Sequence, residues 1–175
     1  MKKKANENPL TREYVAALLS YNKITGVFRW KECTFKSNQW NAAWAGKEAG
    51  SLHHTGYIYI GINGRLYGAH RLAWLLVFGE WPEFEIDHKR GNRADNRISE
   101  LRPASRPQNG MNRGAYKNNS SGFKGVCWHK RIKKWTARIQ VGNKMVNLGY
   151  FLHPQDASAV YESKAKELFG EFKRG

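Results

Sequence analysis

The chain has 175 residues and a mass of 20.2 kDa, which allows one ordinary domain or two small ones and excludes a large multidomain machine. Thirty lysine and arginine residues against fourteen acidic residues give a formal net charge of +16 and a pI of about 10.0. So large an excess of positive charge indicates a polyanionic partner, and nucleic acid is the first candidate.

The sequence gives no sign of a membrane segment or of a disulfide framework. No apolar run approaches the roughly 18 residues that a membrane span needs, and no apolar segment follows the basic start of the chain. Cys33 and Cys127 are too few for a disulfide framework and lack a Cys or His at zinc-finger spacing. We therefore expect a cytoplasmic protein with no membrane partner, two reduced thiols and no zinc. Without a heptad pattern we also expect a monomer.

Positive charge is concentrated in residues 101–155, which contain eleven lysine and arginine residues and no acidic residue. A basic stretch is often only a solvated face. Here aromatic side chains such as Tyr116, Trp128 and Trp135 are interleaved with the cations. This mixture favours a folded basic surface over a disordered tail.

The first part of the chain shows helical and strand patterns separated by turn signals. The expected elements are a helix over residues 11–21, a turn and strand over 22–30, a hairpin over 56–67, a buried helix over 70–78, a strand over 84–88, a polar turn over 89–96, a strand over 97–102 and a helix that starts near Ser105 with Pro107 in its first turn. Thr11 is the expected N-cap of the first helix. Asn63-Gly64 is the expected hairpin turn, and Gly79 should end the buried helix. Residues 31–55 show no pattern that assigns them an element.

The second part of the chain predicts a small domain after a linker. Residues 114–122 are small, polar and bounded by glycines, so we place a linker there between domains at residues 1–113 and 123–175. Apolar residues then alternate with period two over 124–130, 135–141 and 144–150, which predicts a three-stranded antiparallel sheet. Residues 154–169 predict a helix that ends at Gly170 and covers one face of the sheet. The expected fold class is α+β.

The same alternation predicts which side chains of the sheet face the helix. The inward set is Trp135, Ala137, Ile139, Val141, Val146, Leu148 and Tyr150. The outward set is Cys127, His129, Thr136, Arg138, Gln140, Met145 and Asn147.

An acid and an imidazole stand side by side at the end of the predicted strand 84–88, as Asp87 and His88. A hard cation prefers oxygen ligands, so Asp87 and the amide oxygen of Asn109 can hold Mg²⁺ on a phosphate. A histidine near its ordinary pKa of about 6.5 can take a proton from water. Adjacent strand residues point to opposite faces, so both roles require a twist or bend there. The alternative is an ordinary surface acid beside a structural histidine.

Short motifs around this pair occur in a fixed order. They are Ala69-His70-Arg71-Leu72-Ala73-Trp74, Ile86-Asp87-His88, Gly91-Asn92, Asp95-Asn96-Arg97-Ile98, Leu101-Arg102 and Gln108-Asn109. In this order they closely resemble the HNH endonucleases of the ββα-metal type, particularly phage homing endonucleases, over about residues 56–113. The resemblance implies a nuclease module that hydrolyses phosphodiester bonds of double-stranded DNA with one divalent ion, Mg²⁺ or Mn²⁺.

The resemblance also implies roles for individual residues. Asp87 matches the metal-binding acid, His88 the general base, Asn109 the second metal ligand, and Asn96 a hairpin asparagine of the catalytic set. Glu100 stands where the family usually has an asparagine that braces the base histidine. A glutamate can accept a hydrogen bond from the ring N–H and raise its basicity, or it can mark a weakened enzyme.

Some residues near this set keep two interpretations. His70 and Arg71 either cap or pack the start of a helix, or they contact a phosphate near the site. Asn112 lies one helical turn from Asn109 and is a second candidate ligand.

The C-terminal part contains a second set of motif residues. They are Gly125-Val126, Trp135, Arg138-Ile139, Leu148-Gly149, Phe151, Ala157, Tyr161 and Phe169-Gly170. With these, residues 121–170 resemble the APETALA2/ethylene-response-factor DNA-binding domain. A β-ribbon fits the major groove, where Arg reads guanine and Gln or Asn reads adenine, while turn cations neutralise phosphates. The expected DNA contacts are Lys124, His129, Lys130, Arg131, Lys133, Lys134, Arg138, Gln140 and Asn147. The alternative is that Arg138 and Gln140 are merely exposed sheet residues.

Together these patterns predict a site-specific but sequence-tolerant DNA endonuclease of the phage homing type. A phage-encoded protein of this kind would act in the cytoplasm of the bacterial host. The alternative is a non-catalytic DNA-binding regulator built on a degenerate HNH scaffold, which the glutamate at position 100 favours.

Overall fold

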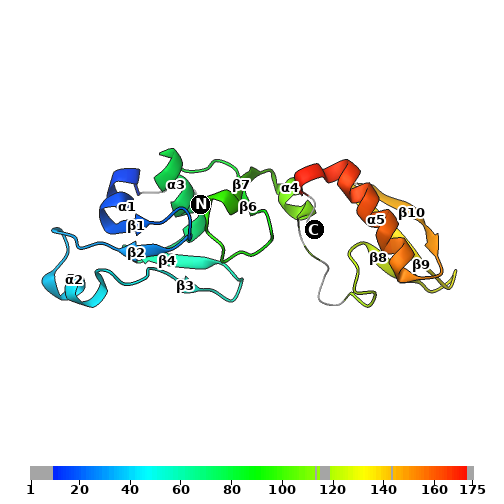
Figure 1. Cartoon of the computed structure of the whole chain (residues 1–175), viewed down its shortest axis with the longest axis horizontal. Helices are drawn as coiled ribbons and strands as arrows, with labels where there is room; N and C mark the ends of the chain where they lie inside the picture. Colours follow the sequence, from blue (N-terminus) through cyan, green and yellow to red (C-terminus); the bar gives the residue numbers. More distant parts are fainter. Residues whose placement is uncertain (1–9, 113, 115–118, 143, 173–175) are drawn as a thin grey trace, which may run out of the picture. The chain divides into compact units, whose positions relative to one another are not determined.

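The computed structural model describes residues 10–112, 114, 119–142 and 144–172 (Figure 1). They form helices and small sheets in the predicted α+β class. The chain divides into two compact units, Met1–Pro103 and Ala104–Gly175. Much of the predicted linker, including residues 115–118, lies outside the described residues, so its place as the domain boundary stays a prediction. Within the described ranges, no helix is long and apolar enough to cross a membrane.

From residue 10 onward, the first unit combines α-helices, a 3₁₀ helix and small antiparallel sheets. Its elements in chain order are α1 (Arg12–Leu18), β1 (Leu19–Tyr21), β2 (Phe28–Trp30), α2 (Asn38–Trp44), β3 (Ser51–Leu52), β4 (Ile58–Ile62), β5 (Arg65–Gly68), α3 (Ala69–Phe78), β6 (Glu85–His88), the 3₁₀ helix η1 (Ile98–Glu100) and β7 (Leu101–Ala104). Strand β1 pairs with β2, β4 lies between β3 and β5, and β6 pairs with β7.

The core of the first unit forms around α3. Leu72, Ala73 and Leu75 of this helix are buried together with Val15 and Leu18 of α1, and α3 also packs against β4 and β5. Gly79 ends α3 with a left-handed φ of 91°, as the sequence predicts. These contacts fix α3 on the scaffold, and the strand pair β6–β7 follows it in the chain.

Two predicted elements of the first unit have different bounds in the structure. The helix expected over residues 11–21 ends at Leu18, because Leu19 adopts an extended conformation and pairs with Trp30. The strand expected over residues 97–102 is instead the 3₁₀ turn η1 followed by β7. The cap and turn predictions are confirmed: the Thr11 side chain accepts a hydrogen bond from Tyr14 N, and Asn63 and Gly64 have φ values of 51° and 72°.

The second unit is a three-stranded antiparallel sheet covered on one face by a helix (Figure 1). Its elements are α4 (Arg106–Met111), β8 (Val126–His129), β9 (Lys134–Val141), β10 (Lys144–Phe151), α5 (Pro154–Phe169) and the 3₁₀ helix η2 (Gly170–Phe172). The buried core contains Val126, Ala137 and Ile139 of the sheet with Ala157 and Tyr161 of α5, which confirms the predicted packing.

A β-bulge in β10 corrects the predicted facing of several side chains. The register with β9 shifts between Asn147 and Gly149, so residues after the bulge reverse their faces. Phe151 therefore packs into the core, whereas Tyr150, expected to face inward, is 42% exposed. Thr136, expected to face outward, is fully buried and donates a hydrogen bond to Asn147 Oδ1 at 2.9 Å.

The two valines near the β9–β10 turn also differ from the prediction. Val141 and Val146, both expected to face the helix, are 41% and 40% exposed. The core cluster ends at Ile139 and Leu148, so alternation alone overstates how far the helix covers the sheet.

Candidate active site

Strand β6 buries the acid and the imidazole that the sequence singled out. Asp87 is 3% exposed and His88 is 4% exposed. Arg102 on the paired strand β7 donates to Asp87 Oδ2 from Nε at 2.7 Å, and its Nη2 lies 2.6 Å from the same oxygen. A guanidinium on a carboxylate makes strong charge-assisted hydrogen bonds. The ion pair therefore fixes the Asp87 carboxylate on β6.

His88 lies among aromatic rings of the first unit. Its ring centroid is 5.3 Å from that of His70 and 5.7 Å from that of Tyr57. Burial lowers the pKa of His88, while the charges of Asp87 and Asp95 act to raise it. The net effect keeps the imidazole neutral at neutral pH, and the neutral form is the one that can accept a proton from water.

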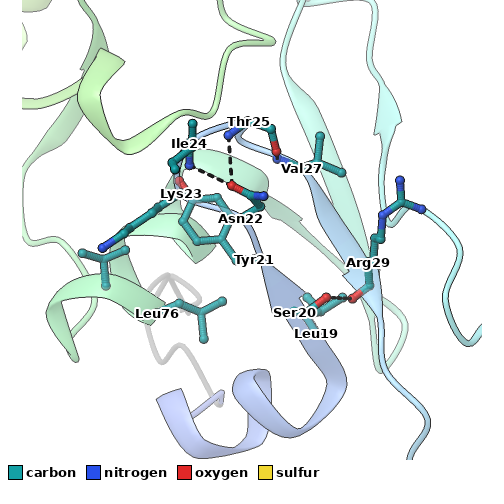
Figure 2. Close-up of a pocket in the computed structure, with 11 residues that line it drawn as sticks. Leu19, Ser20, Tyr21, Asn22, Lys23, Ile24, Thr25, Val27, Arg29 and Leu76 are labelled. Carbon is teal, nitrogen blue, oxygen red and sulfur yellow. Dashed lines mark hydrogen bonds between the residues drawn. The ribbon is translucent and has the colours of Figure 1, made fainter.

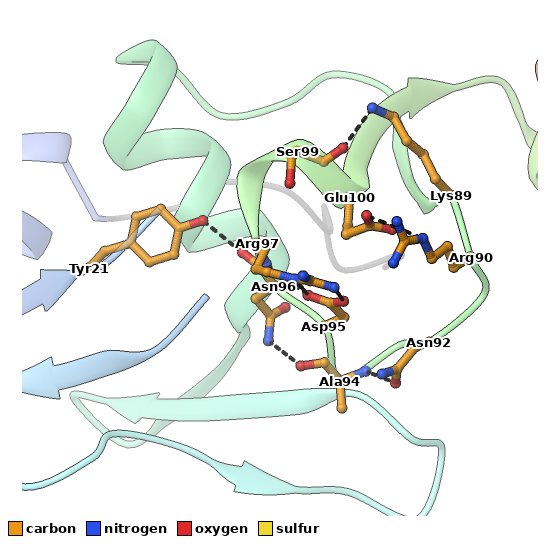
Figure 3. A network of polar contacts seen from close by, with 10 residues as sticks. All are labelled: Tyr21, Lys89, Arg90, Asn92, Ala94, Asp95, Asn96, Arg97, Ser99 and Glu100. Carbon is orange, nitrogen blue, oxygen red and sulfur yellow. Dashed lines mark hydrogen bonds and ion pairs between the residues drawn. The ribbon is translucent and has the colours of Figure 1, made fainter. Parts of the chain in front are cut away.

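Asn96 is a buried amide near His88. It is 2% exposed, its Oδ1 makes no hydrogen bond within the described residues, and its side chain acts to raise the pKa of His88. The Asn96 amide nitrogen donates to the carbonyl oxygen of Ala94 at 3.1 Å (Figure 3). Glu100 lies in the same loop with its Oε1 3.5 Å from Arg90 Nε. Its predicted role as the brace of His88 stays a prediction.

The turn between β1 and β2 clamps the loop that bears Asn96. The Tyr21 hydroxyl donates to the carbonyl oxygen of Asn96 at 2.7 Å (Figure 3), and the N–H of Ile98 donates to the carbonyl oxygen of Lys23 at 3.2 Å. Gly26 has a φ of 75°, and a Cβ there would lie 2.6 Å from the backbone nitrogen of Arg97. Only glycine fits so close an approach of two backbones.

The same turn is internally stiffened. Asn22 Oδ1 accepts hydrogen bonds from the N–H groups of Ile24 at 2.9 Å and Thr25 at 3.1 Å (Figure 2). An open pocket of about 910 Å³ lies here, lined by both strands of the hairpin and by Leu76 of α3.

Burial is the main cause that raises the pKa of Tyr21 to about 12, so its hydroxyl keeps its proton and continues to donate at physiological pH.

His70 and Arg71 at the start of α3 make structural contacts. Burial, followed by the charges of His88 and Arg71, lowers the pKa of His70 to about 3. A neutral imidazole offers no positive charge to a phosphate. Arg71 donates to the carbonyl oxygen of Pro82 at 2.8 Å and lies over the ring of Trp81. These contacts favour the packing interpretation for both residues.

Comparison with known proteins identifies the family that the segment around Asp87 and His88 resembles. Residues 67–111 match the family described as HNH endonuclease. The chain contains an HNH endonuclease domain. It is also 29% identical over 106 residues to Protein 3.8 of Escherichia phage T7, an alignment that covers 60% of this chain and 87% of the phage protein. No solved structure matches the chain.

The HNH match extends into the second unit, where the predicted second metal ligand lies. Asn109 is in α4, whose N-cap Ser105 and Gln108 form a capping box, and Asn112 is the buried C-cap of this helix. Asp87 belongs to the other unit, so the ligand pair stays a prediction. Carboxylate and amide oxygens are donors that suit Mg²⁺ and Mn²⁺. In the described ranges, no three His, Cys, Asp or Glu side chains form a metal-binding group.

The second unit places most of the predicted DNA-contacting cations on its surface. Lys130, Arg131, Lys133 and Lys134 are exposed at the β8–β9 turn. Arg138 and Gln140 are exposed on β9, and Arg138 is paired in register with Asn147 of β10. These residues have the exposure that DNA contact requires.

Three other predicted contacts are engaged within the second unit. His129 is half-buried, and its Nδ1 accepts a hydrogen bond from Ile132 N at 3.3 Å. Asn147 Oδ1 accepts from the N–H of Gly149 at 3.1 Å, inside the β10 bulge. Lys124 Nζ donates to the carbonyl oxygen of Met111 at 2.6 Å. Their expected roles in DNA contact stay predictions.

Sequence reasoning missed the residues that hold the site together. Arg102 belongs to the quoted Leu-Arg motif but received no role, although its place on the strand paired with β6 could have suggested a partner for Asp87. Tyr57 stands at the start of the predicted hairpin, and its contact with His88 depends on tertiary packing. The clamp by Tyr21 has no signal in the sequence.

Proposed function

We propose that this protein is an endonuclease that hydrolyses phosphodiester bonds of double-stranded DNA, with the HNH domain as the cutting module. The observation that supports this most directly is the state of His88. It is a buried, neutral imidazole in contact with Asn96 and adjacent to a fixed carboxylate, and it lies within the matched segment 67–111.

In this proposal His88 acts as the general base. Its lowered pKa leaves the ring free of a proton at neutral pH, so it can take one from the attacking water. The nearby amide of Asn96 favours the protonated imidazole that forms in this step. Asn96 therefore orients the ring and stabilises the charge that the ring acquires.

Asp87 and Asn109 are the proposed ligands of a Mg²⁺ or Mn²⁺ ion. When bound, such an ion supplies charge stabilisation to the phosphate and to the leaving 3′-oxygen. Arg102 keeps the Asp87 carboxylate in one orientation through its two contacts with Oδ2. This arrangement requires an ion that binds well to few protein oxygens, as Mg²⁺ does.

We further propose that the sheet of the second unit sets the cleavage site. Arg138 on the outer face would read bases, while the exposed cations of the β8–β9 turn would neutralise phosphates. This division follows the resemblance of residues 121–170 to the APETALA2-type domain. The similarity to a protein of Escherichia phage T7 supports a phage origin. With the HNH motifs, we propose a homing-type enzyme that acts as a monomer in the bacterial host cytoplasm.

A non-catalytic DNA-binding regulator is the second candidate. Glu100, which stands in the position of the expected asparagine, favours this candidate. The carboxylate of Glu100 lies against Arg90, a contact that has no role in the proposed reaction. Plasmid relaxation in the presence of Mg²⁺ separates the two, because a regulator leaves the supercoiled plasmid intact.

The His88→Ala variant tests the endonuclease itself. Loss of a general base typically costs 10²- to 10⁴-fold in rate, and DNA affinity should hardly change because no phosphate-neutralising cation is lost. His153→Ala is the matched control, since His153 is exposed at the N-cap of α5 and makes no side-chain capping bond. A His88→Ala protein that cuts within threefold of the wild type would refute the assignment.

A further inference from the structure

Arg93 is a positively charged side chain beside the general base to which neither the motifs nor the family match assign a role. It is exposed, and its guanidinium carbon lies 5.0 Å from the ring centroid of Tyr57. Its Nη1 donates to the carbonyl oxygen of Thr55 at 2.9 Å. Tyr57 in turn contacts His88, so one aromatic ring joins the arginine to the base.

The charge of Arg93 is not neutralised by an acid. The neighbouring arginines each have one: Arg90 lies against Glu100, Arg97 binds Asp95, and Arg102 binds Asp87. Among the described residues, Arg93 forms no ion pair. A cation held by an aromatic face and a carbonyl oxygen keeps its full charge, and the same aromatic ring contacts His88.

The geometry of the guanidinium suits an oxyanion of DNA. Within the described part of the chain only Nη1 of Arg93 makes a hydrogen bond, so the Nε and Nη2 groups can donate together to one phosphate. Arginine binds phosphate in this forked manner, which lysine cannot reproduce. The chain has a net charge of +16, so other positive charges repel this exposed cation. Binding of an anion reduces that repulsion.

We propose that Arg93 binds a backbone phosphate of the DNA beside the bond that is cut, and that Tyr57 and the carbonyl of Thr55 hold its guanidinium in place. This proposal rests on the endonuclease function proposed above. Arg93 thereby positions the DNA strand next to His88, and its contribution is distinct from that of the basic surface on the second unit.

The test begins with DNA binding by the full-length protein. Arg93→Gln removes the charge and leaves a shorter polar side chain, whereas Arg93→Lys keeps the charge. Arg29→Gln is the matched control, because it removes one exposed arginine of the same unit that is paired with Glu48 at 3.0 Å. Affinity for a 30-base-pair duplex is measured against NaCl concentration, with Ca²⁺ in place of Mg²⁺.

We expect Arg93→Gln to flatten the slope of log Kd against log [NaCl] by about 0.9, the value for one phosphate contact. Arg93→Lys should retain the wild-type slope, and Arg29→Gln should change it by much less than Arg93→Gln. In single-turnover cleavage with Mg²⁺, Arg93→Gln should be about 10- to 100-fold slower than the wild type, as expected for loss of a hydrogen bond to a charged group. Circular dichroism checks that each variant is folded.

The outcomes separate this proposal from the endonuclease assignment. A flattened slope for Arg93→Gln in a protein that never cuts would support the phosphate contact and refute the nuclease. A folded Arg93→Gln protein with the wild-type slope, or one that cuts within threefold of the wild type, would refute the contact alone. Equal flattening by Arg93→Gln and Arg93→Lys would also refute it, because the effect would then come from the loop and not from the charge.

Discussion

The two interpretations of His70 can be separated by the acid sensitivity of folding. Its pKa is lowered to about 3 in the folded protein, chiefly by burial, against about 6.5 in an unfolded chain. The folded state therefore disfavours the protonated ring. Stability from this group is fully present above pH 6.5 and is lost as the pH falls from 6.5 toward 3.

The size of the loss follows from the number of protons taken up on unfolding. One histidine that titrates only in the unfolded chain costs about 1.4 kcal/mol for each pH unit below 6.5. Between pH 6.5 and pH 5 the free energy of unfolding should fall by about 2 kcal/mol through His70. His88, whose pKa is also lowered, adds to the total, so a His70→Leu variant should be less acid-sensitive than the wild type without being insensitive.

Urea unfolding followed by tryptophan fluorescence at pH 7.0, 6.0 and 5.0 measures this difference. His54→Gln is the control, because His54 is exposed and its removal takes no imidazole out of the interior. Equal acid-induced losses in His70→Leu and the wild type would show that His70 is charged in the folded protein. The interpretation of His70 as a phosphate-contacting cation would then regain support.

Two further pairs of variants test the clamp and the DNA-reading sheet. Tyr21→Phe removes the hydroxyl that donates to Asn96, a bond worth about 1 kcal/mol, and should slow single-turnover cleavage about fivefold. Tyr14→Phe, which loses an exposed tyrosine hydrogen bond elsewhere in the same unit, should leave the cleavage rate unchanged. Equal effects of the two variants would show that the clamp has no part in cleavage. Arg138→Ala should cost about 1 to 3 kcal/mol on preferred DNA only, whereas Lys133→Ala should weaken binding to all sequences and flatten the salt slope by about one. If a binding titration showed that both variants lose equal affinity for specific and for random DNA, the sheet would contribute only electrostatic attraction and no base recognition.

The sequence predicted elements well where a local signal decides the structure. The Asn63-Gly64 turn needs two left-handed residues and has them, and Gly79 ends α3 in the same conformation. The period-two runs placed β8, β9 and β10 and the covering helix α5 correctly. In each case the chemistry of one or two residues, or a repeated apolar pattern, is sufficient.

The remaining features depend on contacts between distant segments. Leu19 leaves the helical conformation because it pairs with Trp30. The sequence of residues 11–21 contains no signal that predicts this pairing. The bulge after Asn147 breaks a regular alternation and turns Tyr150 outward. The same limit applies at the site, where the sequence singled out Asp87 and His88 but assigned Arg102 no role, because its contact with the carboxylate depends on the pairing of β6 with β7.

The structure also shows why the HNH motif depends on residues outside the matched segment 67–111. The loop that presents Asn96 to His88 is fixed from outside by Tyr21 and by the carbonyl oxygen of Lys23. The apolar face of α3 is buried with α1, in a core cluster that also includes Ile86 and Leu101. An isolated loop of polar residues would lose conformational entropy on ordering without burying enough surface to offset it. The N-terminal hairpin and α1 therefore belong to the same structural unit as the matched segment, because they hold the loop of Asn96 and the helix α3 in place.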